Sequence, residues 1–167
     1  MSGSEVTHQL KNGMIYVLLN LRGALPGFHW SLFVPTSKPL GQVWHATNRS
    51  GGWWMETKST SKIPGSVSLC VALELAPCAP QDWDKLCTTL GSVACGEANS
   101  GEPFNCVMWV KDAIIALHDA GVIRLKNGVE TIKDIGEMAV EEGEEHRDPI
   151  EQGTGGAKVI ADTGFTV

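Results

Sequence analysis

Long apolar runs are absent from this sequence, since none approaches the roughly 18 residues that a helix needs to cross a bilayer. Lys and Arg form no cluster, and 13 of them stand against 19 Asp and Glu, giving a formal net charge of -6. An acidic chain without a basic patch lacks the electrostatic footprint of a protein that binds nucleic acid or anionic lipid. The opening residues, "MSGSEVTHQL", also lack the charged and apolar regions of a secretory signal. We therefore expect a cytoplasmic protein that binds neither nucleic acid nor membranes.

Paired cysteine motifs are missing as well. The five cysteines contain no C-x-x-C pair, which argues against a zinc ribbon and against a thioredoxin-type site. Their odd number argues against a complete disulfide framework.

Tyrosine occurs once, whereas tryptophan occurs 6 times, which predicts an aromatic-rich core or cleft. From these patterns we expect neither a metal nor a cofactor.

What the sequence does contain is strand-like alternation followed by helical periodicity. Strand-like runs cover residues 13–21, 28–34, 42–48, 51–58 and 66–75. The last run is the clearest, because alternate residues from Val67 to Leu75 are apolar, as expected of an antiparallel sheet. Helical spacing follows in residues 76–94, 106–121 and 129–145. The sequence therefore predicts an α+β fold in which an antiparallel β-sheet is packed by about three helices.

The chain length of 167 residues suits one domain with its own hydrophobic core. We expect residues 1–140 to form a single α+β domain of catalytic type. Residues 141–167 are first acidic and then glycine-rich, so we expect a mobile C-terminal tail with at most a short strand near its end.

Two histidines lie on neighbouring predicted strands. His29 alternates with Trp30 in "FHWSLFV", and His45 alternates with Trp44 in "QVWHATN", so each histidine points away from the tryptophan beside it. The intervening "PTSKPLG" suits a hairpin that would bring both imidazoles to one surface of the sheet. The structural alternatives are a core imidazole for His29 and a surface residue at the hairpin edge for His45.

A cysteine stands where a polar loop becomes an apolar helix. With Asn105 as the predicted N-cap, Cys106 falls in the first turn, where unpaired N–H groups and the helix dipole stabilise a thiolate and an oxyanion. An unpaired cysteine is more often a small core residue, and we interpret the other four in that way. A thiol becomes a nucleophile when a base removes its proton and a third group orients the base. Cys106, His29 and His45 are candidates for these three roles.

Together, "FHWSLFV", "VWHATN" and "FNCVMWV" at the start of an apolar helix resemble the circularly permuted NlpC-type papain-like superfamily, particularly its lecithin:retinol acyltransferase-like branch. The order His, His, Cys carries the resemblance, which extends over about residues 28–117. It implies a permuted papain-like architecture with His29 as the base, His45 as the residue that orients it and Cys106 as the nucleophile. The Cys106 amide would then be an oxyanion donor.

We expect a cysteine hydrolase or acyltransferase that forms a thioester at Cys106 from an amide, ester or thioester carbonyl. The substrate would be a small molecule or a peptide, and Trp30, Trp44 and Asn105 are predicted to bind it. One alternative is a non-catalytic papain-like binding module with a tryptophan-lined ligand cleft. A second is a zinc site made by His29, His45 and Cys106, with a fourth position open to water.

Overall fold

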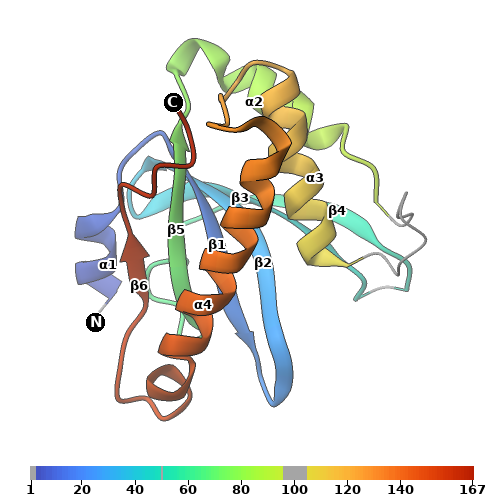
Figure 1. Ribbon diagram of the computed structural model, residues 1–167. Coiled ribbons are helices and arrows are strands. Elements are labelled where there is room, and N and C mark those ends of the chain that lie inside the picture. Colours follow the sequence, from blue (N-terminus) through green and yellow to red (C-terminus); the bar gives the residue numbers. More distant parts are fainter. Residues whose placement is uncertain (1–2, 50, 96–104) are drawn as a thin grey trace.

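The computed structural model describes residues 3–49, 51–95 and 105–167, and its α+β fold confirms the predicted fold class (Figure 1). In chain order the elements are α1 (Gly3–Gln9), β1 (Met14–Arg22), β2 (Leu25–Ser37), β3 (Leu40–Thr47), β4 (Trp54–Thr60), β5 (Leu69–Pro77), the 3₁₀ turn η1 (Pro80–Asp82), α2 (Trp83–Gly91), α3 (Cys106–Asp119), the 3₁₀ turn η2 (Gly128–Glu130), α4 (Thr131–Glu151) and β6 (Lys158–Ile160). The described part has one α-helix more than expected, because the short α1 carries no clear periodicity.

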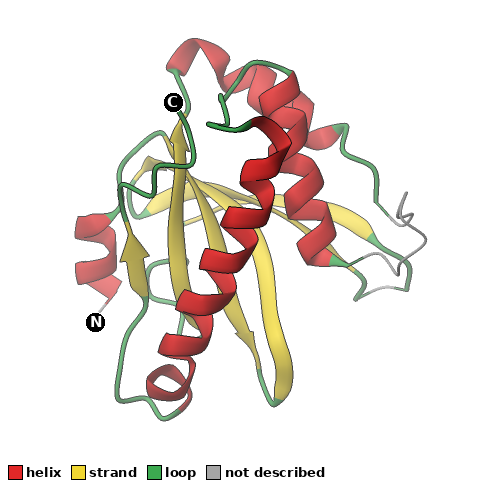
Figure 2. Ribbon diagram, in the orientation of Figure 1, coloured by secondary structure: helices red, strands yellow, loops and turns green. Residues whose placement is uncertain are grey.

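The strands, drawn in yellow in Figure 2, form one open sheet of 6 strands in the order β4-β3-β2-β1-β5-β6, with the labels of Figure 1. The first five are joined by antiparallel ladders, as predicted, whereas β6 runs parallel to β5. The hairpin expected between the two histidine-bearing strands is present as β2 and β3, with Leu32 opposite Trp44. This hairpin provides two of the segments that form the candidate site.

The two faces of the sheet are covered differently. Helices α2, α3 and α4 lie against one face, where Trp30 and Leu32 of β2 share a buried apolar cluster with Trp109 of α3 (Figure 1). Helix α1 covers the other face, where Val6 belongs to a smaller cluster with Phe33. Burial of apolar side chains in both clusters holds the layers together. Because side chains alternate along β2, Trp30 and its neighbour His29 point to opposite faces.

Strand β5 differs from the alternation that the sequence indicated. Every residue from Leu69 to Ala76 is buried, including Cys70 and Glu74, because this strand is covered on both faces. Val67 was expected to share the buried side, but it precedes the strand and is 91% exposed. A strand that is buried on both sides retains apolar residues at alternate positions, so the pattern alone could not identify the second covered face.

The C-terminal segment takes part in the fold further than expected. Helix α4 continues through the acidic residues to Glu151 instead of ending near residue 145. Ile132 and Ile135 of α4 are buried, whereas Val129, where the sequence predicted the helix to begin, lies before it and is 59% exposed. Residues 158–160 then form β6, the expected short strand. Residues 141–167, which we expected to be a tail, thus contribute the end of a helix and an edge strand.

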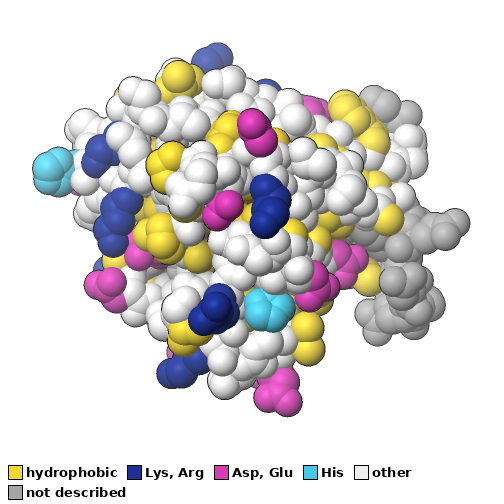
Figure 3. Space-filling view, turned by 90° about the horizontal axis from the view of Figure 1, so that it is seen from above, with side chains coloured by type: hydrophobic (Ala, Val, Ile, Leu, Met, Phe, Trp, Pro, Cys, Tyr) yellow, Lys and Arg dark blue, Asp and Glu magenta, His cyan; other side chains and the backbone are white. Residues whose placement is uncertain are grey.

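The molecular surface mixes charges of both signs. On the face drawn in Figure 3, acidic and basic side chains are interspersed among apolar and neutral ones. None of the helices in the described ranges combines the length and the apolar character required to span a membrane.

Candidate functional site

The candidate site begins where β2 and β3 separate. Their ladder ends at Leu32 opposite Trp44, although both strands continue beyond this pair. Beyond it, β2 continues its ladder with β1, placing His29 opposite Asn20. Strand β3 instead continues with β4. The sheet therefore opens between the two strands at the level of the histidines.

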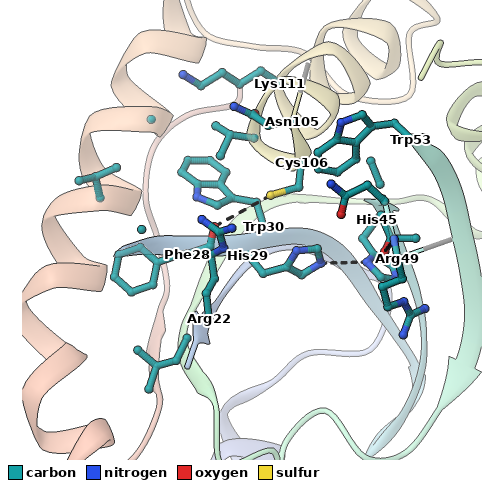
Figure 4. A pocket seen from close by; sticks show the side chains of 18 of the residues that line it. Arg22, Phe28, His29, Trp30, His45, Arg49, Trp53, Asn105, Cys106 and Lys111 are labelled. Atoms are coloured by element: carbon teal, nitrogen blue, oxygen red, sulfur yellow. Dashed lines mark hydrogen bonds between the residues drawn. The ribbon is translucent and has the colours of Figure 1, made fainter. Parts of the chain in front are cut away.

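The two imidazoles bridge this opening. Nε2 of His29 lies 2.8 Å from Nδ1 of His45, within hydrogen-bonding distance, and the rings meet edge to face at an interplanar angle of 89° (Figure 4). The expectation that the hairpin brings these two residues together is thus met. Because backbone hydrogen bonds no longer join β2 to β3 here, the imidazole pair is a direct link between the strands.

A carboxylate and a guanidinium lie on the far side of His45. Glu56 of β4 is opposite His45 in the ladder, and its Oε1 lies 3.7 Å from Nε2 of His45. Arg49, which follows β3, forms an ion pair with Oε2 of the same carboxylate. His29, His45, Glu56 and Arg49 thus form one chain of polar side chains. The sequence analysis did not identify the last two members.

The cysteine lies at the start of α3, as predicted. Asn105 is extended and caps the helix, since its Oδ1 accepts a hydrogen bond of 3.0 Å from the backbone N–H of Met108. Cys106 is the first helical residue and its side chain is buried. The N–H groups of Cys106 and Val107, which precede the capped Met108, have no acceptor within the helix and lie near the sulfur.

The sulfur lies beside the backbone of β2. Sγ of Cys106 is 4.0 Å from the carbonyl oxygen of Phe28, the residue that precedes His29 (Figure 4). Cys106 thus contacts β2 next to His29, from the side of the sheet that the helices cover, whereas the His29 side chain leaves β2 on the other side. Their hydrogen-bond partners differ, because the thiol is directed to this carbonyl and the imidazole to His45.

Burial keeps both histidines neutral near pH 7. It lowers the pKa of His29 to about 4, with smaller contributions from His45, Arg22 and Arg49. Burial also lowers the pKa of His45, although the Glu56 carboxylate opposes the change. Arg49 in turn lowers the pKa of Glu56, chiefly through its hydrogen bond, and so favours the carboxylate. A neutral imidazole can accept a proton from a thiol.

A cavity of about 690 Å³ connects these groups. Its lining residues come from β1, β2, β3, α3, α4 and the segments beside them: Leu21, Arg22, Gly27, Phe28, His29, Trp30, His45, Ala46, Thr47, Asn48, Arg49, Trp53, Asn105, Cys106, Val107, Lys111, Gly136, Val140 and Glu144. Its volume is typical of sites for small molecules. All three predicted catalytic residues border the same cavity.

Of the three residues predicted to bind substrate, two border the cavity and one does not. Trp30 and Asn105 border the cavity, as does Trp53. Trp44 is not among the lining residues, because its side chain is buried and packs against Trp83 with ring centroids 5.9 Å apart.

A group of possible metal ligands lies on α4, away from the histidine pair and Cys106. Among the residues that the structure describes, one group of three brings its ligand atoms within 4.8 Å of one another: Glu142, Glu145 and His146 on α4. The zinc alternative of the sequence analysis required His29, His45 and Cys106, and these do not form such a group. In addition, the hydrogen bond between the imidazoles occupies one ring nitrogen of each.

The sequence signals the hairpin that carries Glu56, although it does not give the register. The glycines at positions 51 and 52 indicate a turn after the second histidine strand, and both have positive φ. The observed ladder pairs Thr47 with Trp54 and His45 with Glu56, whereas a turn centred on the two glycines would place Lys58 opposite His45. The pattern of residues 51–58 predicts a strand but does not show which of its residues lies opposite His45.

Comparison with known proteins gives one match. The model of a family of unknown function, DUF6540, matches residues 15–124, which extend from β1 to just after α3 and include both histidines and the cysteine. No curated protein and no solved structure matches the chain.

Proposed function

The chain belongs to the DUF6540 family, and from its site we propose that it is a cysteine-dependent acyl-transfer enzyme, a thiol hydrolase or an acyltransferase. The observation that carries the proposal is the shared cavity bordered by Cys106, His29 and His45. It contains the residue types of a nucleophile, a base and an orienting group. The order of these residues and the helix-start cysteine also support a permuted papain-like architecture.

The first half of the reaction forms a thioester. The thiol proton of Cys106 passes to the His29 imidazole, and the sulfur bonds to the carbonyl carbon of an amide, ester or thioester. The bond from that carbon to the leaving group breaks as the leaving atom takes the proton from His29. Unpaired N–H groups at the start of α3 stabilise the negative carbonyl oxygen that forms on the way.

The second half releases the acyl group. Water, an amine or a hydroxyl attacks the thioester carbon and gives its proton to His29. The carbon–sulfur bond breaks, and the sulfur regains the proton. The acceptor determines whether the protein is a hydrolase or a transferase.

The cavity favours a substrate with an apolar part and an anionic group. Among its lining residues, Arg22, Arg49 and Lys111 are basic and Glu144 is acidic. Arg49 is neutralised by its ion pair, whereas the guanidinium of Arg22 donates to a backbone carbonyl. Within the described ranges, Lys111 has neither an ion-pair nor a hydrogen-bond partner. A carboxylate or phosphate on the substrate would supply one.

A non-catalytic binding module is the second candidate. The hydrogen bond from the Cys106 thiol to the Phe28 carbonyl favours it, because a thiol held by a backbone oxygen is not directed at a base. In that case the cavity would bind its ligand without a covalent step, and the histidine pair would serve to link β2 to β3.

Selective alkylation separates the two candidates. We expect iodoacetamide at pH 7 to modify Cys106 at least about tenfold faster than the other four cysteines, as followed by peptide mass spectrometry. Burial raises the pKa of Cys70 to about 11 and raises the pKa of Cys78, Cys87 and Cys95, which slows their reaction.

The histidine variants complete this experiment. His29→Ala should remove the selectivity for Cys106, whereas His8→Ala, at an exposed position on α1, should retain it. Equal labelling of all five cysteines in the native wild-type protein, or protection of Cys106, would contradict the enzyme and favour the binding module.

A further inference from the structure

The carboxylate beside His45 faces the ring nitrogen that the histidine pair leaves unused. Nδ1 of His45 contacts His29, and Nε2 lies 3.7 Å from Oε1 of Glu56. The exposed fractions of the His45 and Glu56 side chains are 15% and 19%, so solvent screens their interaction only partly. The antiparallel register of β3 and β4 fixes this arrangement, since the two residues are directly opposite.

We propose that Glu56 is a positioning residue that sets the tautomers of both histidines and leaves Nδ1 of His29 as the proton acceptor. The proposal extends the acyl-transfer function and rests on it for the identity of the proton donor, Cys106. The arrangement of protons within the chain from Glu56 to His29 can be measured independently.

The argument follows the protons from one ring to the next. A neutral imidazole carries one N–H, and a carboxylate only accepts hydrogen bonds. At 3.7 Å the negative carboxylate attracts an N–H on Nε2 of His45 electrostatically, so the proton of His45 belongs there and Nδ1 keeps a lone pair. The 2.8 Å contact then requires that Nε2 of His29 donate to this lone pair. Nδ1 of His29 is left without a proton.

The opposite arrangement would place a proton on Nδ1 of each ring. It satisfies the contact between His29 and His45 equally well, so the histidine pair alone does not choose between the two. In that arrangement, however, Nδ1 of His29 has no lone pair, and Nε2 of His45 directs its lone pair at the Glu56 carboxylate. Electrostatic repulsion between these groups disfavours it.

Charged neighbours keep Glu56 ionised and His45 neutral, as this assignment of tautomers requires. Arg49 forms an ion pair with Glu56 and keeps it ionised, as its lowered pKa indicates. Arg49 and Lys58 also act on His45, and both disfavour its protonated form. Since His29 is also neutral near pH 7, each ring has one N–H to place.

Nitrogen NMR of the histidine side chains tests the assignment. In the wild type at pH 7, two-bond hydrogen–nitrogen couplings should identify both His29 and His45 as Nε2–H tautomers. Glu56→Gln should convert a measurable fraction of both rings to Nδ1–H, because the side-chain amide of glutamine can donate to Nε2 of His45. Glu56→Asp retains an acceptor and should keep the wild-type tautomers.

The control is Glu130→Gln, which makes the same change at an exposed position outside the cavity and should alter neither ring. Alkylation of Cys106 should become at least about tenfold slower in Glu56→Gln but not in Glu56→Asp. Backbone amide spectra of each variant establish that it is folded. Glu56→Asp also keeps the test usable if the glutamine variant does not fold.

The outcomes separate this proposal from the proposed function. Nδ1–H tautomers in the wild type, or unchanged tautomers in Glu56→Gln, would overturn the role of Glu56. Changed tautomers with an unchanged Cys106 alkylation rate would overturn the link from Glu56 to the thiol. If the tautomers respond as expected while wild-type Cys106 shows no selective reactivity, the tautomer assignment stands and the acyl-transfer function fails.

Discussion

Nε2 of His29 and Nδ1 of His45 lie 2.8 Å apart at the place where β2 and β3 no longer share a backbone ladder. The contact joins the strands through side chains instead of backbone groups. Through this contact His45, the predicted orienting residue, binds His29, the predicted base. Removal of either imidazole should therefore affect both stability and reactivity.

Replacing His45 tests both effects together. His45→Ala leaves Nε2 of His29 without its partner in a partly buried site, and should lower the free energy of unfolding by about 1–3 kcal/mol. Chemical denaturation measures this loss. The rate of Cys106 alkylation should fall by a factor on the order of 10² because the base is no longer oriented. An unchanged alkylation rate in the folded variant would show that His45 does not act on His29.

The lowered pKa of His29 predicts how stability depends on pH. In the unfolded chain this imidazole gains its proton near pH 6.5, whereas in the folded protein it does so near pH 4. The unfolded state binds more protons between these values, so stability is full above pH 6.5 and declines as the pH falls toward 4. We expect His29 to contribute about 2 kcal/mol to this decline.

The measurement is denaturant unfolding at a series of pH values. His29→Gln should flatten the profile between pH 6.5 and 4, while His8→Gln, at an exposed position, should leave it unchanged. A profile for His29→Gln as steep as that of the wild type would contradict the assigned pKa.

Two glycines of α4 should respond oppositely to the same substitution. A Cβ at Gly143 would lie 2.8 Å from a ring carbon of Phe28 and 3.0 Å from a methyl carbon of Leu19, too close for the packed interface between helix and sheet. A Cβ at Gly136 would meet the flexible end of Lys111 at 3.3 Å. Gly143→Ala should therefore lower the free energy of unfolding by about 1–3 kcal/mol.

Gly136→Ala serves as the matched control in the same helix. It should be neutral or stabilising by up to about 1 kcal/mol, because alanine favours a helix over glycine and the lysine end can move. Equal destabilisation of both variants in urea unfolding would contradict the close packing of Phe28 and Leu19 against α4.

If Lys111 binds an anionic group of the substrate, its replacement should slow the reaction of anionic substrates selectively. With 4-nitrophenyl acetate as the neutral substrate and the mono-4-nitrophenyl ester of glutaric acid as the anionic one, the wild type should prefer the anionic ester in kcat/KM. Lys111→Gln should lower kcat/KM for the anionic ester by about tenfold and leave the neutral ester nearly unchanged, since one charge-assisted hydrogen bond is lost. Equal losses for both esters would argue against an anion-binding role.

Local patterns were sufficient to predict much of this site. Alternation beside tryptophan placed His29 and His45 on a hairpin, and the asparagine before an apolar run predicted the cap at the start of α3. Each of these features depends on residues close together in the chain. The α+β fold class follows from the same patterns.

Features that depend on tertiary packing could not be read in this way. The alternation in "VWHATN" does not show that Trp44 faces the helix-covered side, where it packs against Trp83. The pairing of Glu56 with His45 requires the register of β4. Similarly, the acidic sequence of residues 141–145 suggested a tail because only one of these residues, Gly143, is buried, where it packs against Phe28.

The most direct test of the account is the mass of the intact protein during its reaction with 4-nitrophenyl acetate. Rapid acid quenching should trap one acetyl group per chain, and peptide mapping should locate it on Cys106 as a thioester that hydroxylamine removes. Cys106→Ala should give no such adduct, while Cys87→Ala should give the same adduct as the wild type. Absence of the thioester in the wild type, or acetylation of the same extent in Cys106→Ala, would contradict the assignment of Cys106 as the nucleophile.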